Sequence, residues 1–267
     1  MFPTRSRSEV RSTGWLTVAL LLGGLLLCYY LLPLAALVVA RPPGDVAARL
    51  GDPSVIGAVT NSLVSATAST VVATALGLPL AYWLARTETR WRSLVVAVVV
   101  LPLVLPPIVS GLVLLTLVGP NSAVGTAAAA AGVPLTRSLA GVVLAQTFVA
   151  SPFVVVTAKA AFEGVDDRLE EAAFTLGESR AATFRRVTLP LAWPGVLAGV
   201  TLAFARSMGE FGATMMLAYY PRTMPVQIWV SFTTTGLSEA FPVALVLVGV
   251  SIAALVVLNL VGTNPWD

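Results

Sequence analysis

The sequence predicts an all-α membrane protein with six transmembrane helices and both termini in the cytoplasm. Three observations support this fold class: hydrophobic residues make up 57% of the 267 residues, charged residues make up only 11%, and the apolar residues form long uncharged runs. A soluble domain carries about a quarter charged residues, and the mean hydropathy here is +0.89. Lipid must therefore solvate much of the surface of this protein.

Six runs are long enough to cross the apolar layer of a bilayer, which takes about 20 residues. The first is too long for the core of a signal peptide, so we interpret it as a retained helix. We expect the fifth to continue past Arg206 and Glu210, and we expect a short external helix within the alanine-rich stretch 123–133. The predicted transmembrane helices are 12–40, 55–85, 93–118, 138–158, 187–218 and 240–261.

The arginines predict the orientation, because cytoplasmic segments carry an excess of basic residues. With the N-terminus inside, ten arginines fall in cytoplasmic segments and four in external ones. The predicted organisation is a cytoplasmic N-terminus (1–14), a first helix with an external loop (15–54) and a core of five helices (55–262). A charged segment of this core, 163–187, then lies in the cytoplasm.

Several classes of function are disfavoured by residues that the sequence lacks. It has no histidine, and its one cysteine is Cys28, so the commonest general base and the common zinc ligands are missing. We therefore expect no catalytic residues and no metal site, which argues against a membrane enzyme. No glycine-rich phosphate loop occurs, so we expect this chain to bind no cofactor and no ATP itself. A net charge of +3 without a basic patch gives no indication of nucleic-acid binding.

The charged segment 163–187 predicts two short helices separated by a glycine. Asp167 and Glu170 have the spacing of a capping box at the start of the first helix. Gly177 can adopt the left-handed conformation that ends a helix. Local chemistry alone also fits a well-capped cytosolic loop without a partner.

The second short helix is predicted to begin after Ser179, whose side chain can cap it. Arg185 and Arg186 would occupy its last turn, where cations are favoured. Pro190 is tolerated at the start of the next transmembrane helix but not inside the preceding helix. The chain would then re-enter the membrane.

The spacing within this segment resembles the EAA signature of ABC importer permeases. Glu-Ala-Ala is followed by three residues, a glycine, nine residues and Val-Thr-Leu-Pro, with valine where the family usually has isoleucine. The resemblance extends over 55–260, including Asn-Ser-Leu at 61–63 and LGLPLAYWLAR at 76–86, and implies the type I ABC importer permease fold. It also implies that the segment forms a coupling helix, which docks in a groove of the ATP-binding subunit. The residues that match the signature are Glu171, Ala172, Ala173, Gly177, Val187, Leu189 and Pro190.

Two further stretches resemble the permeases for molybdate, tungstate and sulfate. They are LPLVLPPIVSGLVLL (101–115) and FARSMGEFGATMMLAYYP (204–221), and the forms LPLVLPP and GEFGAT look most like the molybdate/tungstate branch. In that family, helices three and five line the translocation path and the external gate. The residues to which this implied role is carried over are Pro106, Pro107, Ser110, Arg206, Ser207, Glu210, Phe211 and Thr214.

The residues of these two stretches also have purely structural interpretations. The prolines could simply bend a packing helix, because neighbouring groups can satisfy the carbonyls that they free. Arg206 and Glu210 are four residues apart and share a helix face. Charges within a membrane span usually face a protein interior or a water-filled route, so this pair could equally lock helix five to its neighbours.

The resemblance implies a subunit that moves a tetrahedral oxyanion, molybdate or tungstate, by alternating access. The implied partners are a second copy of the permease, two cytoplasmic ATP-binding subunits that use the ATP, an external solute-binding protein and the surrounding lipid of the cell membrane. An importer of sulfate or another anion is the nearest alternative. A carrier driven by an ion gradient is a rival of another class. Such carriers often contain inverted repeats and broken half-helices, and the sequence indicates neither.

Overall fold

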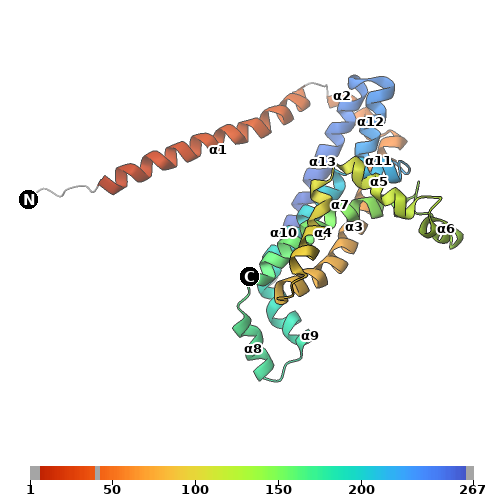
Figure 1. Cartoon of the computed structure of the whole chain (residues 1–267). Coiled ribbons are helices and arrows are strands. Elements are labelled where there is room, and N and C mark those ends of the chain that lie inside the picture. Colours follow the sequence, from red (N-terminus) through yellow and green to blue (C-terminus); the bar gives the residue numbers. More distant parts are fainter. Residues whose placement is uncertain (1–6, 40–42, 263–267) are drawn as a thin grey trace, which may run out of the picture. The chain divides into compact units, whose positions relative to one another are not determined.

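The computed structural model describes residues 7–39 and 43–262. The regular elements of this part of the chain are helices, and no strand occurs among them, which confirms the predicted all-α class (Figure 1). The chain divides into two compact units, 1–48 and 49–267, and each is described by itself.

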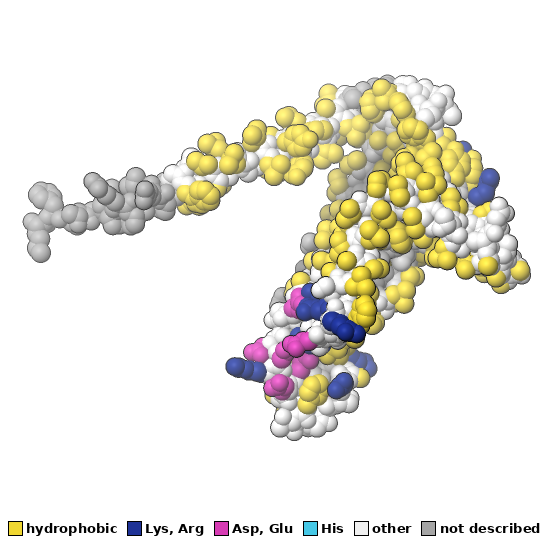
Figure 2. Space-filling view, in the orientation of Figure 1, with side chains coloured by type: hydrophobic (Ala, Val, Ile, Leu, Met, Phe, Trp, Pro, Cys, Tyr) yellow, Lys and Arg dark blue, Asp and Glu magenta, His cyan; other side chains and the backbone are white. Residues whose placement is uncertain are grey.

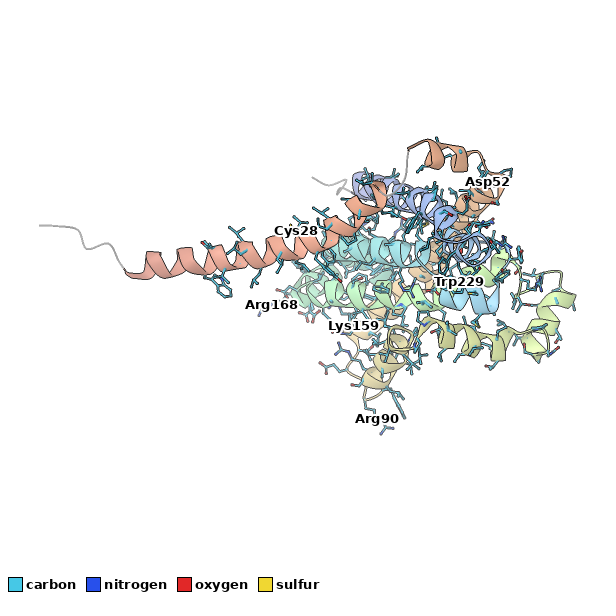
Figure 3. The ribbon with its side chains drawn as sticks, turned by 90° about the horizontal axis from the view of Figure 1, so that it is seen from above. Cys28, Asp52, Arg90, Lys159, Arg168 and Trp229 are labelled. Atoms are coloured by element: carbon cyan, nitrogen blue, oxygen red, sulfur yellow. The ribbon has the colours of Figure 1, made fainter. Side chains whose placement is uncertain are left out.

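The first unit contains α1, Arg7–Val39. Its apolar portion, Gly14–Val39, has a mean hydropathy of 2.2 and is not buried inside the structure. Cys28, the one cysteine of the chain, is exposed on this helix (Figure 3). A helix that is apolar on all sides and uncovered is stable in lipid rather than in water. The short helix α2, Pro43–Leu50, follows.

The second unit consists of helices joined by short connections. They are α3 (Pro53–Arg86), α4 (Arg92–Val104), α5 (Pro107–Val118), α6 (Ala123–Ala130), α7 (Leu139–Glu163), α8 (Asp167–Thr175), α9 (Arg180–Thr183), the π-helical segment η1 (Phe184–Thr188), α10 (Leu189–Met208), α11 (Gly212–Leu217), α12 (Met224–Thr235) and α13 (Leu237–Gly262).

Five helices of the described residues are long and apolar enough to cross a membrane, or six when α4 and α5 count as one span. The protein is therefore a multi-pass membrane protein. The predicted runs correspond to α1, α3, the pair α4 and α5, α7, α10 and α13. The short helix expected within 123–133 is present as α6. The helix α12, just before α13, was not predicted.

The centre of the second unit is the packing of α3, α7 and α10. Small residues allow these helices to approach closely, as in other membrane proteins. At Gly199 of α10, a Cβ atom would lie 1.9 Å from the hydroxyl oxygen of Thr157 and 3.2 Å from the carbonyl oxygen of Phe153. The hydroxyls of Ser69 and Ser207 are 3.0 Å apart, so a hydrogen bond also joins α3 to α10 in the apolar interior.

The predicted third transmembrane helix is not continuous. The axes of α4 and α5 differ by 117°, so the prediction of one helix over 93–118 was wrong. The break falls at Leu105 and Pro106, which both have extended ψ angles, 134° and 135°. Each of these residues precedes a proline, and the ring of a following proline disfavours helical geometry. Pro107 then begins α5, where a missing N–H costs nothing.

The predicted fifth helix is also interrupted. Its first part, α10, ends at Met208, and the chain continues as α11 only from Gly212, so the prediction of one helix through 218 was wrong. The buried carboxylate of Glu210 accepts a hydrogen bond from the backbone N–H of Ala213 at 2.7 Å. Because this carboxylate satisfies an N–H at the start of α11, it supports a new helix start instead of continued α10.

Charged side chains gather at the end of the second unit that holds α8 and α9 (Figure 2). Lys159 and Arg168 lie toward this end, whereas Asp52 and Trp229 lie toward the other (Figure 3). Apolar side chains cover the surface between the two ends (Figure 2). A charged end next to an apolar surface is typical of a membrane protein whose charged segment lies outside the bilayer.

Candidate functional site

The first helix of the segment 163–187, which we call the coupling segment, begins with a different cap from the one predicted. Asp166 is the N-cap residue of α8, and its side chain accepts a hydrogen bond from the N–H of Arg168 at 3.0 Å. The capping box of Asp167 and Glu170 was therefore a wrong prediction. Asp167 is already helical, and the carboxylate of Glu170 binds side chains of other helices instead.

The turn between α8 and α9 agrees with the sequence prediction. Gly177 has a φ of +87°, the left-handed conformation in which glycine has no steric penalty. Ser179 caps the next helix by accepting a hydrogen bond from the N–H of Ala182 at 3.3 Å. The two helices of the coupling segment are therefore separated as expected.

The second helix does not end before the membrane, contrary to the prediction. From α9 the chain continues through the π-helical segment η1 into α10, and Thr188 and Leu189 both have right-handed helical angles. Arg185 and Arg186 lie in the last turn of η1 rather than at the free end of a helix. The coupling segment is thus joined to α10 without a hinge.

The residues of the EAA signature divide between an outer and an inner face. Glu171, Ala172 and Gly177 are exposed, whereas Ala173 is buried. Val187, Leu189 and Pro190 are half-buried where the chain enters α10. Three apolar side chains beside the exposed residues are also uncovered, and the most exposed is Leu176 at 85%. They are Leu169, Phe174 and Leu176.

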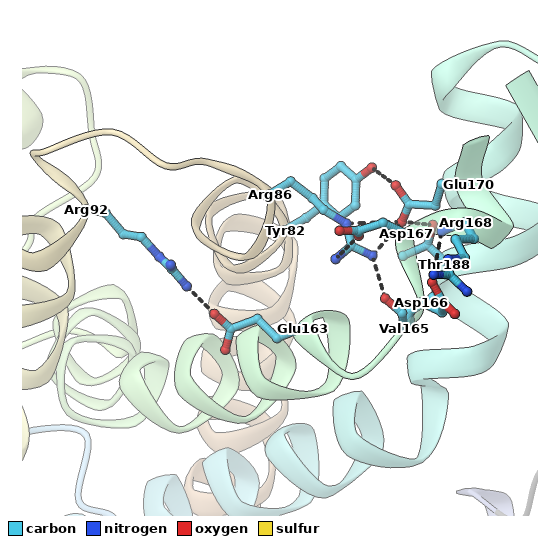
Figure 4. A network of polar contacts seen from close by, with 10 residues as sticks. All are labelled: Tyr82, Arg86, Arg92, Glu163, Val165, Asp166, Asp167, Arg168, Glu170 and Thr188. Atoms are coloured by element: carbon cyan, nitrogen blue, oxygen red, sulfur yellow. Dashed lines mark hydrogen bonds and ion pairs between the residues drawn. The ribbon is translucent and has the colours of Figure 1, made fainter.

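A network of polar contacts centred on Glu170 holds the coupling segment against the membrane helices (Figure 4). Its carboxylate accepts hydrogen bonds from the guanidinium of Arg86 at 2.7 Å and from the hydroxyl of Thr188 at 2.7 Å. The hydroxyl of Tyr82 donates a longer bond of 3.4 Å. Tyr82 and Arg86 belong to the end of α3, and Thr188 to η1. Sequence reasoning assigned no such role to these residues.

The surroundings of Glu170 keep it ionised. Burial acts to raise the pKa of its carboxyl group, but the hydrogen bonds from Arg86 and Thr188 and the charge of Arg86 outweigh burial, so the pKa lies below its ordinary value. The contribution of the network to stability is therefore present above the ordinary carboxyl pKa of about 4.3. That contribution is lost as the pH falls through the lowered pKa of the folded protein.

The two helix breaks meet, because α5 packs against α11. At Gly212 of α11, a Cβ atom would lie 2.8 Å from the Cβ of Pro107 and 3.0 Å from the N atom of Ile108. At Gly111 of α5, it would lie 2.6 Å from the Cβ of Met216 and 2.9 Å from the carbonyl oxygen of Ala213. Only residues without a side chain allow this backbone approach.

An ion pair lies beside this contact. The distance between Arg206 Nη2 and Glu210 Oε2 is 2.5 Å, and the side chain of Glu210 is 1% exposed while that of Arg206 is 26% exposed. Because Glu210 lies beyond the end of α10, the pair bridges the break instead of lying along one helix face. Both residues border a cavity of about 250 Å³.

The structure brings together four of the eight residues predicted for the path. Pro107, Arg206, Glu210 and Phe211 line this cavity, together with Ile108, Gly209 and Gly212. The other four predicted residues, Pro106, Ser110, Ser207 and Thr214, are not part of its lining.

Ser207 points instead into the helix core, where its hydroxyl meets Ser69 and its carbonyl accepts a hydrogen bond from Gln146 at 3.1 Å. The hydroxyls of Ser110 and Thr214 are fully buried and have no hydrogen-bond partner.

The bundle with broken spans and a charged segment continuous with α10 is a membrane-embedded helical subunit. The chain belongs to the family described as binding-protein-dependent transport system inner membrane component, whose model matches residues 77–263. It is a permease subunit of an ABC importer, and as such a transport subunit and not an enzyme. The structure contains broken half-helices, which the sequence did not indicate and which also occur in ion-gradient-driven carriers. The family match nevertheless places the chain among ABC importer permeases.

Relatives along almost the whole chain carry transport names. The chain is 62% identical over 253 residues to the "Probable molybdenum ABC transporter permease protein" of Haloferax volcanii, which covers 95% of this chain and 93% of that protein. It is 36% identical to the "Molybdate/tungstate transport system permease protein WtpB" of Pyrococcus abyssi, covering 89% and 92%. It is 41% identical to the "Molybdenum transport system permease protein ModB" of Mycobacterium tuberculosis, covering 82% and 83%.

The fold is also similar to that of a solved transporter. A crystal structure of a bacterial ABC transporter involved in the import of the acidic polysaccharide alginate matches with a TM-score of 0.73 at 16% identity. The match covers 97% of this chain and 99% of that one. At this identity, the likeness concerns the fold alone.

Proposed function

We propose that this permease carries molybdate or tungstate into the cell. The observation that carries the proposal is the 62% identity, over 95% of the chain, to a relative named for molybdenum transport. More distant relatives named for molybdate/tungstate and molybdenum transport support the same substrate class. In this proposal the permease is a homodimer, receives the anion from an external solute-binding protein, and is driven by two cytoplasmic ATP-binding subunits.

The translocation path, in this proposal, passes the meeting point of the two helix breaks. A tetrahedral oxyanion needs positive charge or hydrogen-bond donors along its route, and it is repelled by an unpaired negative wall. The guanidinium of Arg206 borders the cavity there, and its pairing with Glu210 neutralises the buried carboxylate. Short helices that end at a break can be displaced more readily than a continuous span, which suits a gate.

The coupling segment would receive the ATP-binding subunit on its outer face. That face combines exposed Glu171 with uncovered Leu176, and such a mixture of apolar and charged groups is suited to docking a protein partner. Closure of the two ATP-binding subunits would displace the segment. Because the segment continues directly into α10, its displacement would shift the population between inward- and outward-facing states.

The substrate can be tested with the complex in proteoliposomes, together with its ATP-binding subunits and binding protein. We expect ATP-dependent uptake of molybdate and tungstate, each of which competes with the other, and no uptake with a non-hydrolysable ATP analogue. Phosphate is the control for a different tetrahedral anion. Uptake of sulfate without competition from molybdate would contradict the proposal and favour a sulfate importer.

The orientation can be tested by labelling. In a Cys28→Ser background, a Thr175→Cys variant should react with a membrane-impermeant thiol reagent only from the cytoplasmic side, because Thr175 is exposed in the coupling segment. A Val133→Cys variant is the matched control, since Val133 is 51% exposed in the connection after α6. It should react only from outside. The reverse pattern would overturn the proposed topology.

A further inference from the structure

Only two residues of α8, Glu170 and Ala173, are buried. The apolar attachment of this helix to the rest of the protein is therefore small. Of these two residues, Ala173 contributes only a methyl group, whereas Glu170 forms hydrogen bonds with two other elements. Whatever force acts on α8 must reach the membrane helices largely through Glu170 and the turns at the ends of α8.

We infer that Glu170 is a positioning residue for transport, which makes the coupling segment and the cytoplasmic ends of α3 and α10 move as one body. This inference rests on the proposed docking of the ATP-binding subunit on the coupling segment. It assigns the transmission of that movement to a specific buried carboxylate, and it concerns the inner face of α8 rather than the docking face.

The geometry of the contacts supports transmission in two directions. Toward α3, both Nε and Nη2 of Arg86 donate to Oε1 of Glu170, at 3.2 Å and 2.7 Å. Toward α10, the hydroxyl of Thr188 donates to the same oxygen at 2.7 Å. One oxygen atom thus joins α8 to a helix 84 residues earlier and to the start of α10. Hydrogen bonds to an ionised, buried acceptor are stronger than those between neutral groups.

Two neighbouring contacts are weaker or differently placed. The Nη1 atom of Arg86 lies 2.9 Å from Asp167, but the Asp167 side chain is 73% exposed, where an ion pair contributes little. Arg92 of α4 pairs with Glu163 of α7 and not with α8 (Figure 4). Glu170 is therefore the buried charge that connects α8 with the membrane helices.

Aromatic packing keeps the partners of Glu170 in place. The ring of Tyr82 contacts those of Phe162 and Phe184 edge-on, with centroid distances of 5.6 Å and 4.9 Å. Phe184 begins η1, and Thr188 ends it. Because π-helical turns are rare and frequently occur at functional sites, a turn that supplies both an aromatic contact and a hydrogen-bond donor to Glu170 is consistent with a transmitting role.

The test compares ATP hydrolysis and anion uptake in the reconstituted complex of permease, ATP-binding subunits and binding protein. For Glu170→Gln we expect the complex to assemble and to hydrolyse ATP near the rate of the wild type. The number of molybdate ions transported per ATP should fall about tenfold, which lies within the range by which mutations along coupled residues change a coupling. A residue with only a structural role would lower assembly and both activities together and leave the ratio unchanged.

Smaller changes keep the inference testable if Glu170→Gln does not assemble. Thr188→Val and Tyr82→Phe each remove one hydroxyl without leaving a buried charge alone. Thr188→Val should lower the ratio more than Tyr82→Phe, because its hydroxyl lies 2.7 Å from the carboxylate and that of Tyr82 lies 3.4 Å away. Glu88→Gln is the matched control, since Glu88 is an exposed glutamate just beyond α3, and it should leave the ratio unchanged.

Two variants separate this inference from the proposed docking role. Glu171→Lys and Gly177→Ala alter the outer face and the turn, and they should weaken co-purification of the ATP-binding subunit and lower uptake. If both co-purify and transport like the wild type, the docking role itself is wrong. If they fail but Glu170→Gln, Thr188→Val and Tyr82→Phe all transport normally per ATP, docking stands and the inference about Glu170 is overturned.

Discussion

Replacement of Glu210 by alanine is expected to abolish anion uptake and to lower the free energy of unfolding by about 3 kcal/mol. The change removes two interactions at once: the ion pair with Arg206 and the hydrogen bond from the N–H of Ala213 that supports the start of α11. It leaves the guanidinium of Arg206 without its partner. Because that side chain is 26% exposed, the loss should fall at the low end for a broken buried pair. Thermal unfolding in detergent and uptake in proteoliposomes measure the two effects.

Two comparisons separate the roles of the carboxylate. Glu210→Gln retains an oxygen that can accept the hydrogen bond from the N–H of Ala213, but it loses the charge. It should therefore unfold at a higher temperature than Glu210→Ala and still transport poorly. The double variant Arg206→Ala with Glu210→Gln should be more stable than the single variant Arg206→Ala, because no unpaired buried charge remains. If Glu210→Gln and Arg206→Ala both transport like the wild type, the pair is a structural lock only.

Replacement of Gly111 by alanine is expected to separate α5 from α11 and to lower the free energy of unfolding by about 2 kcal/mol, as overpacking of a close contact does. The new methyl carbon would meet the Cβ of Met216 at 2.6 Å and the carbonyl oxygen of Ala213 at 2.9 Å. A backbone oxygen cannot move aside as a flexible side chain can. Uptake by the folded protein should also fall, because the displaced helices line the cavity beside Arg206. The loss of uptake should therefore exceed the loss of folded protein.

The control for this variant is Gly249→Ala in α13. A Cβ at Gly249 would have no atom within 4 Å. The same chemical change should therefore leave the unfolding temperature unchanged or raise it slightly, since alanine favours a helix. Thermal unfolding of the two variants in the same detergent makes the comparison. Equal unfolding temperatures of the two variants would show that the contact of α5 with α11 is not tightly packed.

Local features of the sequence predicted much of this fold. Uncharged runs predicted the membrane helices because the bilayer demands a fixed apolar length. Gly177 and Ser179 predicted the turn of the coupling segment because their conformational preferences act on their own backbone. The roles implied for the signature residues of the coupling segment stay predictions.

The parts that could not be predicted depend on contacts between distant residues. Pro106 and Pro107 indicated a bend, but whether a bend becomes a break of 117° depends on what α5 packs against. The acidic residues within 166–171 suggested a capping box that includes Glu170. The carboxylate of Glu170 instead accepts a hydrogen bond from Arg86, 84 positions away. A spacing of four suggested that Arg206 and Glu210 share one helix, because the sequence does not reveal that the helix ends between them.

The π-helical segment η1 gives a physical meaning to the fixed spacing of the EAA signature. From Arg180 to Leu189 the chain runs as one continuous helical path, so each residue in it sets an angle as well as a distance. Deletion of a single residue within this path would turn the part of the chain before it by about 100° around the axis of α10, the rotation per residue of an α-helix. Glu170 would then face away from Arg86. Substitutions here change contacts, whereas insertions and deletions change the direction in which the preceding part of the segment points. The number of residues between Ser179 and Val187 therefore sets the orientation of the coupling segment.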